Sequence, residues 1–388
     1  MNAQGIRHWL RENDDRRLEE LWQRADQARR LHVGDEVHLR ALIEISNFCV
    51  RRCAYCGLRV PRAGLERYRM GADEIVDCAR QGRSLGCGTV VLQSGEDPAI
   101  TREWVADLVR RLRATLPDLA ITLSFGERSG EELRAWKDAG ADRYLLRFET
   151  SNRSLYNRIH PPLPGRRSDR IAILRSLRRQ GYEVGSGVMI GIPGQTYEDL
   201  ARDIELFVEL ELDMIGVGPF IPHPDTPLRQ AAPTGFSRRA AKPAPSPTTG
   251  PEGEATPVPS PLDWRQVRLP APPALGDQVP ASEEMTCKVL ALARLVRPHA
   301  NIPSTTALAT INARDGRERG LMRGANVVMP NLTPMKYRRL YEIYPNKACL
   351  AESPTDCSGC LEGRIRSIGR KVGVGRGDAW RAAVRAAE

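Results

Sequence analysis

The chain has 388 residues, 41% of them hydrophobic and only 5% aromatic, and its formal net charge is +10. The length suits one large domain or two modest ones. The few aromatic residues argue against a surface that stacks nucleic-acid bases. No run of about 18 apolar residues exists that could span a membrane, and the N-terminus lacks the apolar core of a secretion signal. We therefore expect a cytoplasmic protein with no membrane partner.

Along the chain, an N-terminal helical segment comes first, at residues 1–40. Within it, residues 13–30 have the apolar spacing of an amphipathic helix. After it, short β-rich runs alternate with amphipathic helical stretches. The expected strands are 41–46, 89–94, 119–124, 143–148, 184–190, 214–218, 301–306 and 325–329. This α/β alternation predicts a parallel sheet closed into a complete (β/α)8 TIM barrel over residues 41–333, and a doubly wound open sheet is the alternative.

Residues 231–280 interrupt the predicted barrel and hold twelve of the 29 prolines. Such a composition buries too little apolar surface to offset the entropy of ordering it, so a disordered, low-complexity insertion is expected. It is either a loop without function or a docking segment for a partner. Residues 334–388 form a C-terminal extension that ends in a basic tail.

The stretch FCVRRCAYCG carries three closely spaced cysteines, Cys49, Cys53 and Cys56, directly after the first expected strand. Active sites of (β/α)8 barrels lie at this end of the strands. A structural zinc site or a ferredoxin cluster takes four protein ligands, and no fourth cysteine or histidine lies close by. A third interpretation is an iron–sulfur cubane held by three cysteines, whose open iron binds a small molecule.

The pattern Cys-x3-Cys-x-aromatic-Cys, with Tyr55 as the aromatic residue, resembles the signature of the radical S-adenosylmethionine (SAM) superfamily. The resemblance implies a 4Fe–4S cluster whose open iron binds SAM, and reductive cleavage of SAM to a 5′-deoxyadenosyl radical. The stretch LQSGEDP resembles the family's Gly-Gly-Glu motif, which implies that Gly95 and Glu96 lie near the SAM amino group. Ser94 stands where the motif has its first glycine. GVMIGIPGQT resembles the strand beside the adenine.

A second triad, Cys349, Cys357 and Cys360, lies in CLAESPTDCSGC. In a reduced compartment such a cluster indicates a metal site rather than disulfides. Structural zinc with a remote ligand is one interpretation. Cys78, Cys87 and Cys287 are interpreted as core residues, and His160 and His223 as structural residues of proline-flanked loops.

Within the superfamily, residues 41–230 and 281–362 resemble the HydE family of FeFe-hydrogenase maturases, in which the second triad often binds a dispensable auxiliary cluster. The resemblance implies such a cluster here, 2Fe–2S or 4Fe–4S. It further implies that Glu149 binds the SAM ribose and that Arg170 binds the SAM carboxylate. By itself, Arg170 would be interpreted as a solvated helix residue. The residues implied to contact a substrate are Ser94, Arg147, Thr305 and Thr306.

Strand alternation places Arg143 and Arg147 on one face, and an arginine inside a barrel needs an anion. That anion is either a ligand or the carboxylate of a neighbouring strand.

The function implied by the resemblance is assembly of the hydrogenase H-cluster on a small, anionic, cysteine-derived iron–CO–cyanide substrate. The implied partners are a scaffold GTPase, a sister radical SAM maturase and an electron donor, without nucleic acid. Methylornithine synthase, a lysine mutase, and biotin synthase-like sulfur insertion are the alternative activities. A zinc or iron–sulfur protein that binds nucleic acid through its +10 charge is the alternative of another class.

Overall fold

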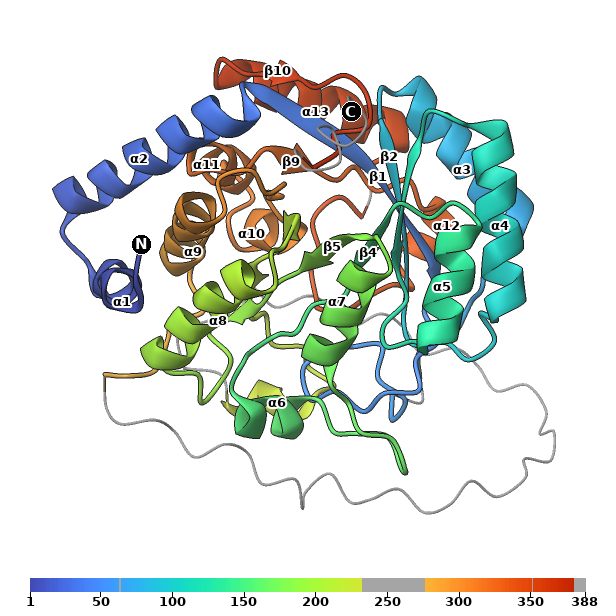
Figure 1. The fold of residues 1–388 in the computed structure, drawn as a ribbon, viewed down its shortest axis with the longest axis horizontal. Helices are drawn as coiled ribbons and strands as arrows, with labels where there is room; N and C mark the ends of the chain where they lie inside the picture. The colour runs from blue at the N-terminus through green and yellow to red at the C-terminus, as the bar shows by residue number, and fades with distance from the viewer. Residues whose placement is uncertain (63, 232–275, 351, 380–388) are drawn as a thin grey trace.

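A computed structural model describes residues 1–62, 64–231, 276–350 and 352–379 (Figure 1). The helices are α1 Ala3–Arg11, α2 Asp15–Val33, α3 Ala72–Ser84, α4 Arg102–Thr115, α5 Gly130–Asp138, α6 Arg153–Ile159, α7 Arg170–Arg179, α8 Tyr197–Glu209, η1 Pro227–Ala231, α9 Glu283–Val296, α10 Thr306–Ile311, α11 Gly316–Met322, α12 Met335–Arg338 and α13 Pro354–Ser367. The strands are β1 Glu36–Ser46, β2 Thr89–Ser94, β3 Ala120–Ser124, β4 Arg143–Leu145, β5 Glu183–Ser186, β6 Met189–Ile190, β7 Met214–Ile215, β8 Gly218–Pro219, β9 Val327–Val328 and β10 Lys371–Val372. The predicted insertion at 231–280 falls almost entirely outside the described residues.

The main sheet is parallel and curled, in the order β10-β1-β2-β3-β4-β5-β7, and β9 also pairs with β1. The long first strand accommodates three neighbours because each one pairs with a different part of it. The strand interiors are apolar on both faces, as in β2, where only Gln93 is partly exposed. This pattern is typical of parallel strands covered by helices, and Figure 1 shows helices around the outside of the sheet.

The prediction of a complete barrel is wrong in its last part, because the regular strands form a half-barrel. The stretch 301–306 is not a regular strand. Asn301 and Pro303 make single parallel bridges to Met214 and Val327, respectively, and these bridges span the gap between β7 and β9. Pro303 has no N–H group to donate to a ladder. Thr305, two residues later, already caps α10.

Two further predicted strands are split, at 184–190 and 214–218. Their first halves join the main sheet as β5 and β7, and their second halves pair as β6 and β8 in a separate two-stranded sheet. Between the halves, the two backbones touch. A Cβ atom on Gly187 would lie 1.8 Å from the carbonyl oxygen of Gly216. Glycine is required at such a close approach.

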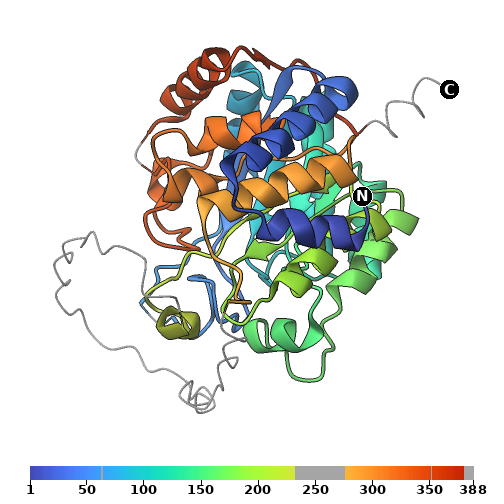
Figure 2. The same ribbon diagram turned by 90° about the vertical axis from the view of Figure 1, so that its left-hand side faces the viewer.

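At the amino-terminal ends of the strands, the C-terminal segment packs against the sheet. The guanidinium of Arg143 on β4 is fully buried, 2.7 Å from a carboxylate oxygen of Glu183 on β5 and 2.6 Å from one of Asp378. An inward arginine was predicted to need an anion. For Arg143, that anion is supplied by the protein itself, by Glu183 on the neighbouring strand and by Asp378. In Figures 1 and 2, α1 and α2 lie beside α8 and α9 on the outside.

Candidate active site

The first cysteine triad lies on the loop that follows β1. Asn47 begins this loop, and its side-chain amide donates to the carbonyl oxygens of Glu66 and Leu340 at 2.8 and 2.9 Å. Arg67 donates to the carbonyl oxygens of Asn47 and Leu58 at 2.5 and 2.9 Å. These bonds fasten the loop from several directions. The protein therefore holds the loop in place with its own side chains.

The thiol of Cys53 is buried, and those of Cys49 and Cys56 are half-buried. Burial raises the pKa of Cys49, raises that of Cys53 well above its usual range and raises that of Cys56 to about 12. A charge on any of them would disfavour a charge on its neighbours, so a cationic centre is needed to hold three thiolates here. Three thiolates on one tight loop fit an iron–sulfur cluster that leaves one iron to another ligand.

The end of β2 packs directly against the cysteine loop. A Cβ atom on Gly95 would lie 2.2 Å from the carbonyl oxygen of Phe48 and 2.7 Å from the Cβ of Cys49. Glycine is therefore the residue that lets the strand end and the loop approach this closely. The carbonyl oxygen of Glu96 in turn accepts a hydrogen bond from the N–H of Val50 at 3.0 Å. The Gly95–Glu96 pair and the cysteine loop form one structural unit.

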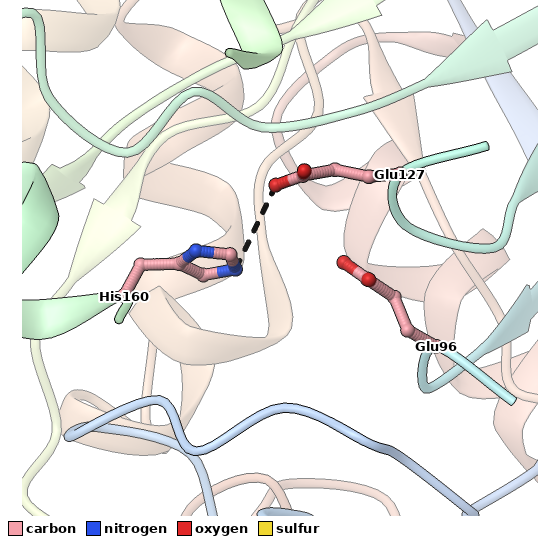
Figure 3. A group of neighbouring side chains, drawn as sticks. All are labelled: Glu96, Glu127 and His160. Atoms are coloured by element: carbon pink, nitrogen blue, oxygen red, sulfur yellow. Dashed lines mark ion pairs between the residues drawn. The ribbon is translucent and has the colours of Figure 1, made fainter. Parts of the chain in front are cut away.

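Glu96, Glu127 and His160 converge beside this unit (Figure 3), with one ligand atom of each within 4.8 Å of the others. Two arginines enter the same group. Arg51 lies 2.5 Å from Glu96 and 2.8 Å from Glu127, and Arg170 lies 3.0 Å from Glu127 and 3.6 Å from Glu96. Two guanidinium groups thus balance two carboxylates. This balance favours an ion-pair network over a site for a further metal ion.

The pKa values of the two carboxyl groups of this network are shifted in opposite directions. Burial raises the pKa of Glu96. Burial also acts on Glu127, but Arg170, Ser168 and Arg51 outweigh it and lower its pKa. One carboxylate oxygen of Glu96 and Nη1 of Arg51 are buried and have no hydrogen-bond partner among the described residues. Buried polar atoms normally have partners, so these two atoms are suited to a polar ligand.

The predicted ribose and substrate residues, Glu149 and Arg147, pair with each other after β4. Nη2 of Arg147 lies 3.0 Å from Oε2 of Glu149 and donates to the carbonyl oxygen of Val188 at 2.7 Å. Glu149 has a φ of 65°, which is unusual for a residue with a side chain. Burial raises the pKa of Tyr55 well above its usual range, and charges on Cys53 and Glu149 act in the same direction. Tyr55 is therefore near both the triad and Glu149.

The three hydroxyl residues predicted to line the substrate cavity lie at the ends of elements. Ser94 ends β2, and its hydroxyl donates to the carbonyl oxygen of Gly95 at 2.7 Å. Thr305 caps α10, accepting from the N–H of Leu308 at 3.4 Å, and Thr306 is the first residue of that helix. The hydroxyl groups of Ser94 and Thr305 thus form hydrogen bonds with the backbone of nearby residues. Their contact with a substrate stays a prediction.

The second triad lies within the C-terminal extension, where the structure describes two of its side chains. Cys349 is half-buried, and its sulfur lies 3.3 Å from Nη2 of Arg317. Its φ is 64°. Cys360 is exposed on α13. The side chain of Cys357 is outside the described part of the chain. An auxiliary metal site on these cysteines stays a prediction.

Sequence reasoning missed Arg51 and Glu127 and interpreted His160 as a structural residue. A signal for Glu127 exists, because Gly126–Glu127 follows β3 as Gly95–Glu96 follows β2. Gly126 has a φ of 73°, and a Cβ atom there would lie 2.0 Å from the Cγ of Glu96. Repeated Gly–Glu pairs on neighbouring strand ends could therefore have predicted two adjacent carboxylates. His160 has no such signal, because neither its own residue type nor its neighbours in the sequence show that its ring faces Arg170. By contrast, Arg170 is buried rather than solvated.

Comparisons with known proteins agree with this geometry. Residues 43–207 match the radical SAM superfamily. The chain is 42% identical to the FeFe hydrogenase maturase subunit HydE of Thermotoga maritima, over 93% of this chain and 89% of that one. A 3-methylornithine synthase of Methanosarcina acetivorans is 28% identical over 58% of this chain and 63% of its own length. The crystal structure of methylornithine synthase (PylB) is similar in fold, with a TM-score of 0.75 and 23% identity over 100% of this chain and 96% of that chain.

The curled parallel sheet, with its three-cysteine loop after the first strand, is the architecture of a radical SAM enzyme. Within that superfamily, the chain belongs to the family of the hydrogenase maturase HydE. A 4Fe–4S cluster and SAM are the cofactors of this superfamily. Among the described residues, every helix is too short or too polar to cross a membrane.

Proposed function

We propose that this protein cleaves SAM reductively and uses the resulting radical on a small, cysteine-derived iron–CO–cyanide substrate during assembly of the hydrogenase H-cluster. The observation that carries the proposal is the fit of the cysteine loop against Gly95, with a buried carboxylate–guanidinium network beside it. The similarity to a HydE maturase over 93% of the chain supports the hydrogenase context.

In this proposal, Cys49, Cys53 and Cys56 hold a 4Fe–4S cluster and leave one iron to SAM. When bound, the cluster supplies the electron that cleaves SAM into methionine and a 5′-deoxyadenosyl radical. Cys53 is buried, and the bonds from Arg67 would keep the loop in place around the cluster.

The site offers a partner for three of the polar groups of SAM: its ammonium, its carboxylate and its ribose hydroxyls. Oε1 of Glu96, which accepts no hydrogen bond among the described residues, suits the SAM ammonium group. Arg170 suits the carboxylate, since a guanidinium binds carboxylates in a bidentate manner. Glu149, whose left-handed backbone follows β4, suits the ribose hydroxyls. Tyr55, which lies between Cys53 and Cys56 in the loop, would contribute a wall of the SAM site.

For the substrate, we assign the anion site to Arg147 and the hydroxyl contacts to Ser94, Thr305 and Thr306. Nε of Arg147 is buried without a hydrogen-bond partner among the described residues. The side chain of Arg147 is 34% exposed, so it is accessible to an anion. An anionic substrate that binds here competes with Glu149 for the guanidinium.

The remaining assignments rest on the family alone. Cys349, Cys357 and Cys360 would hold an auxiliary 2Fe–2S or 4Fe–4S cluster. The partners would be an electron donor, a sister radical SAM maturase and a scaffold GTPase, all in the cytoplasm.

The proposal is tested with protein purified and reconstituted with iron and sulfide in the absence of oxygen. Dithionite and SAM are added, and 5′-deoxyadenosine and methionine are quantified. We expect both products in equal amounts, and activation of an unmatured hydrogenase when the other maturases are supplied. If no 5′-deoxyadenosine forms, the proposed chemistry is wrong. If 5′-deoxyadenosine forms together with 3-methylornithine from lysine, the alternative activity of a lysine mutase replaces the maturase.

A further inference from the structure

His160 directly follows α6, and its imidazole is fully buried next to Arg170. Nε2 of the imidazole lies 2.6 Å from Nη2 of the guanidinium. A guanidinium only donates hydrogen bonds, so Nε2 must be the acceptor and the ring must be neutral, with its proton on Nδ1. That proton is directed to the hydroxyl oxygen of Tyr156, 3.1 Å away. The hydrogen-bond partners thus fix both the tautomer and the orientation of the ring.

Glu127 binds a second nitrogen, Nε, of the same guanidinium. Its Oε1 accepts from Nε of Arg170 at 3.0 Å and from the hydroxyl of Ser168 at 2.5 Å. Nη1 of Arg170 donates to the carbonyl oxygen of Arg147 at 2.7 Å. Three of the five N–H groups of Arg170 are thus used, one on each nitrogen. The two that remain, one on Nη1 and one on Nη2, are the number that a bidentate carboxylate accepts.

The surroundings of His160 keep its ring neutral. Burial, followed by the charges of Arg170 and Arg51, lowers the pKa of His160 far below its usual value. A protonated ring would be unable to accept from Arg170. It would also place a second positive charge within 2.6 Å of the guanidinium. A neutral acceptor is therefore what this position requires.

We propose that His160 and Glu127 are positioning residues, which orient the Arg170 guanidinium so that its two remaining N–H groups meet the carboxylate of SAM. This inference rests on the proposed function and assigns a role to two residues that do not themselves touch SAM. A planar guanidinium can bind a carboxylate through two bonds only when its plane and direction are correct. If His160 only filled space, a residue of similar size without an acceptor would serve equally well.

The test compares two variants of the full-length, reconstituted protein. His160→Leu keeps the volume but removes the acceptor, and His160→Gln keeps an acceptor in its amide oxygen. Equilibrium binding is measured with SAM and with decarboxylated SAM, which lacks the carboxylate. Binding is independent of turnover, and circular dichroism checks the fold. His38→Leu is the matched control, because His38 is a half-buried histidine on β1 whose ring packs against Gly373 and Gly377, away from the network.

We expect His160→Leu to weaken SAM binding by about 10-fold or more, the usual loss for a hydrogen bond to a charged group. The affinity for decarboxylated SAM should change much less, and His160→Gln should restore most of the SAM affinity. Glu127→Gln, which retains a hydrogen-bonding side chain but loses the charge, should show the same selective loss. It also provides an independent test if His160→Leu does not fold.

Equal losses for SAM and decarboxylated SAM, or equal effects of the leucine and glutamine variants, would overturn the inference. So would unchanged SAM binding in both His160→Leu and Glu127→Gln. These outcomes are distinct from failure of the proposed function. If the unsubstituted protein neither binds nor cleaves SAM, both ideas fail. If it cleaves SAM and the variants bind SAM as it does, only the positioning role fails.

Discussion

The two cysteine triads differ in how the protein surrounds them. The first lies on a loop that is fastened by Asn47 and Arg67 and packed against Gly95. In the second, Cys349 is half-buried and Cys360 is exposed. A site whose ligands are held by the core can set the geometry of a reaction, whereas a site at the surface depends on its own short segment. From this difference we propose that the chemistry depends on the first triad and that the second is peripheral to it.

The largest expected effect comes from the first triad. Cys53→Ala removes a buried ligand from a set of three, and no other cysteine lies nearby in the sequence to replace it. We expect complete loss of 5′-deoxyadenosine formation and a loss of iron and visible absorption. Chromatography of the reaction products and iron analysis measure both. SAM cleavage at the unsubstituted rate would mean that the first triad is not the reactive centre.

The next effect tests the packing around that triad. Gly95→Ala places a Cβ atom 2.2 Å from the carbonyl oxygen of Phe48, so the loop or the strand end must move. We expect a loss of about 1–3 kcal/mol in the free energy of unfolding and poor incorporation of the cluster. Gly64→Ala is the control, since a Cβ atom on Gly64 would have nothing within 4 Å of it. Denaturant unfolding and iron content should separate the two variants, and equal behaviour would contradict the packing argument.

A third prediction concerns Lys347, whose ion pair with Glu44 holds the segment of the second triad against the sheet. Lys347 lies two residues before Cys349, yet it is buried and forms an ion pair with Glu44 inside the sheet. Lys347→Met leaves Glu44 buried without its cation, which costs about 3–5 kcal/mol. Thermal unfolding should show a lower Tm, and adding Glu44→Gln should recover part of the loss. A Tm that does not change in Lys347→Met would show that the extension is not anchored there.

The smallest effect is expected at the exposed cysteine of the second triad. Cys360→Ala should lower the iron content of the reconstituted protein by the number of iron atoms that one auxiliary cluster holds. The rate of SAM cleavage should stay within about twofold of the unsubstituted protein, because distant sites act independently. A dead Cys360→Ala protein with an intact first cluster would show that the two regions are coupled.

Much of the fold could be predicted from the sequence, because apolar strands covered by helices leave a clear pattern. The strand at 89–94 has the predicted bounds, and Cys78, Cys87 and Cys287 are buried as expected. The predicted strand at 301–306 failed, because Pro303 lacks a donor and Thr305 caps a helix. The split of 184–190 depends on contact between Gly187 and Gly216. A contact between distant residues has no signature in either segment alone.

The candidate site was only partly predictable for the same reason. Cysteine spacing and a strand-end Gly–Glu pair are local patterns, so the loop and Glu96 could be found. Glu127 has the same kind of local signal in Gly126–Glu127 and was overlooked. That Glu127 and His160 both bind the Arg170 guanidinium could not be predicted, since the three residues come from different segments. The ion pair between Arg147 and Glu149 was also missed, although the two residues are close in sequence. The fold decides which charged side chains form ion pairs, and the composition of the chain does not show these pairings.

The most direct test of the comparison replaces the whole second triad. A protein with Cys349→Ala, Cys357→Ala and Cys360→Ala is reconstituted without oxygen, reduced and given SAM, and 5′-deoxyadenosine is measured over time. We predict formation at close to the unsubstituted rate, with the first cluster intact. Loss of 5′-deoxyadenosine, despite a correctly folded protein with a full first cluster, would contradict the claim that the first triad alone carries the chemistry.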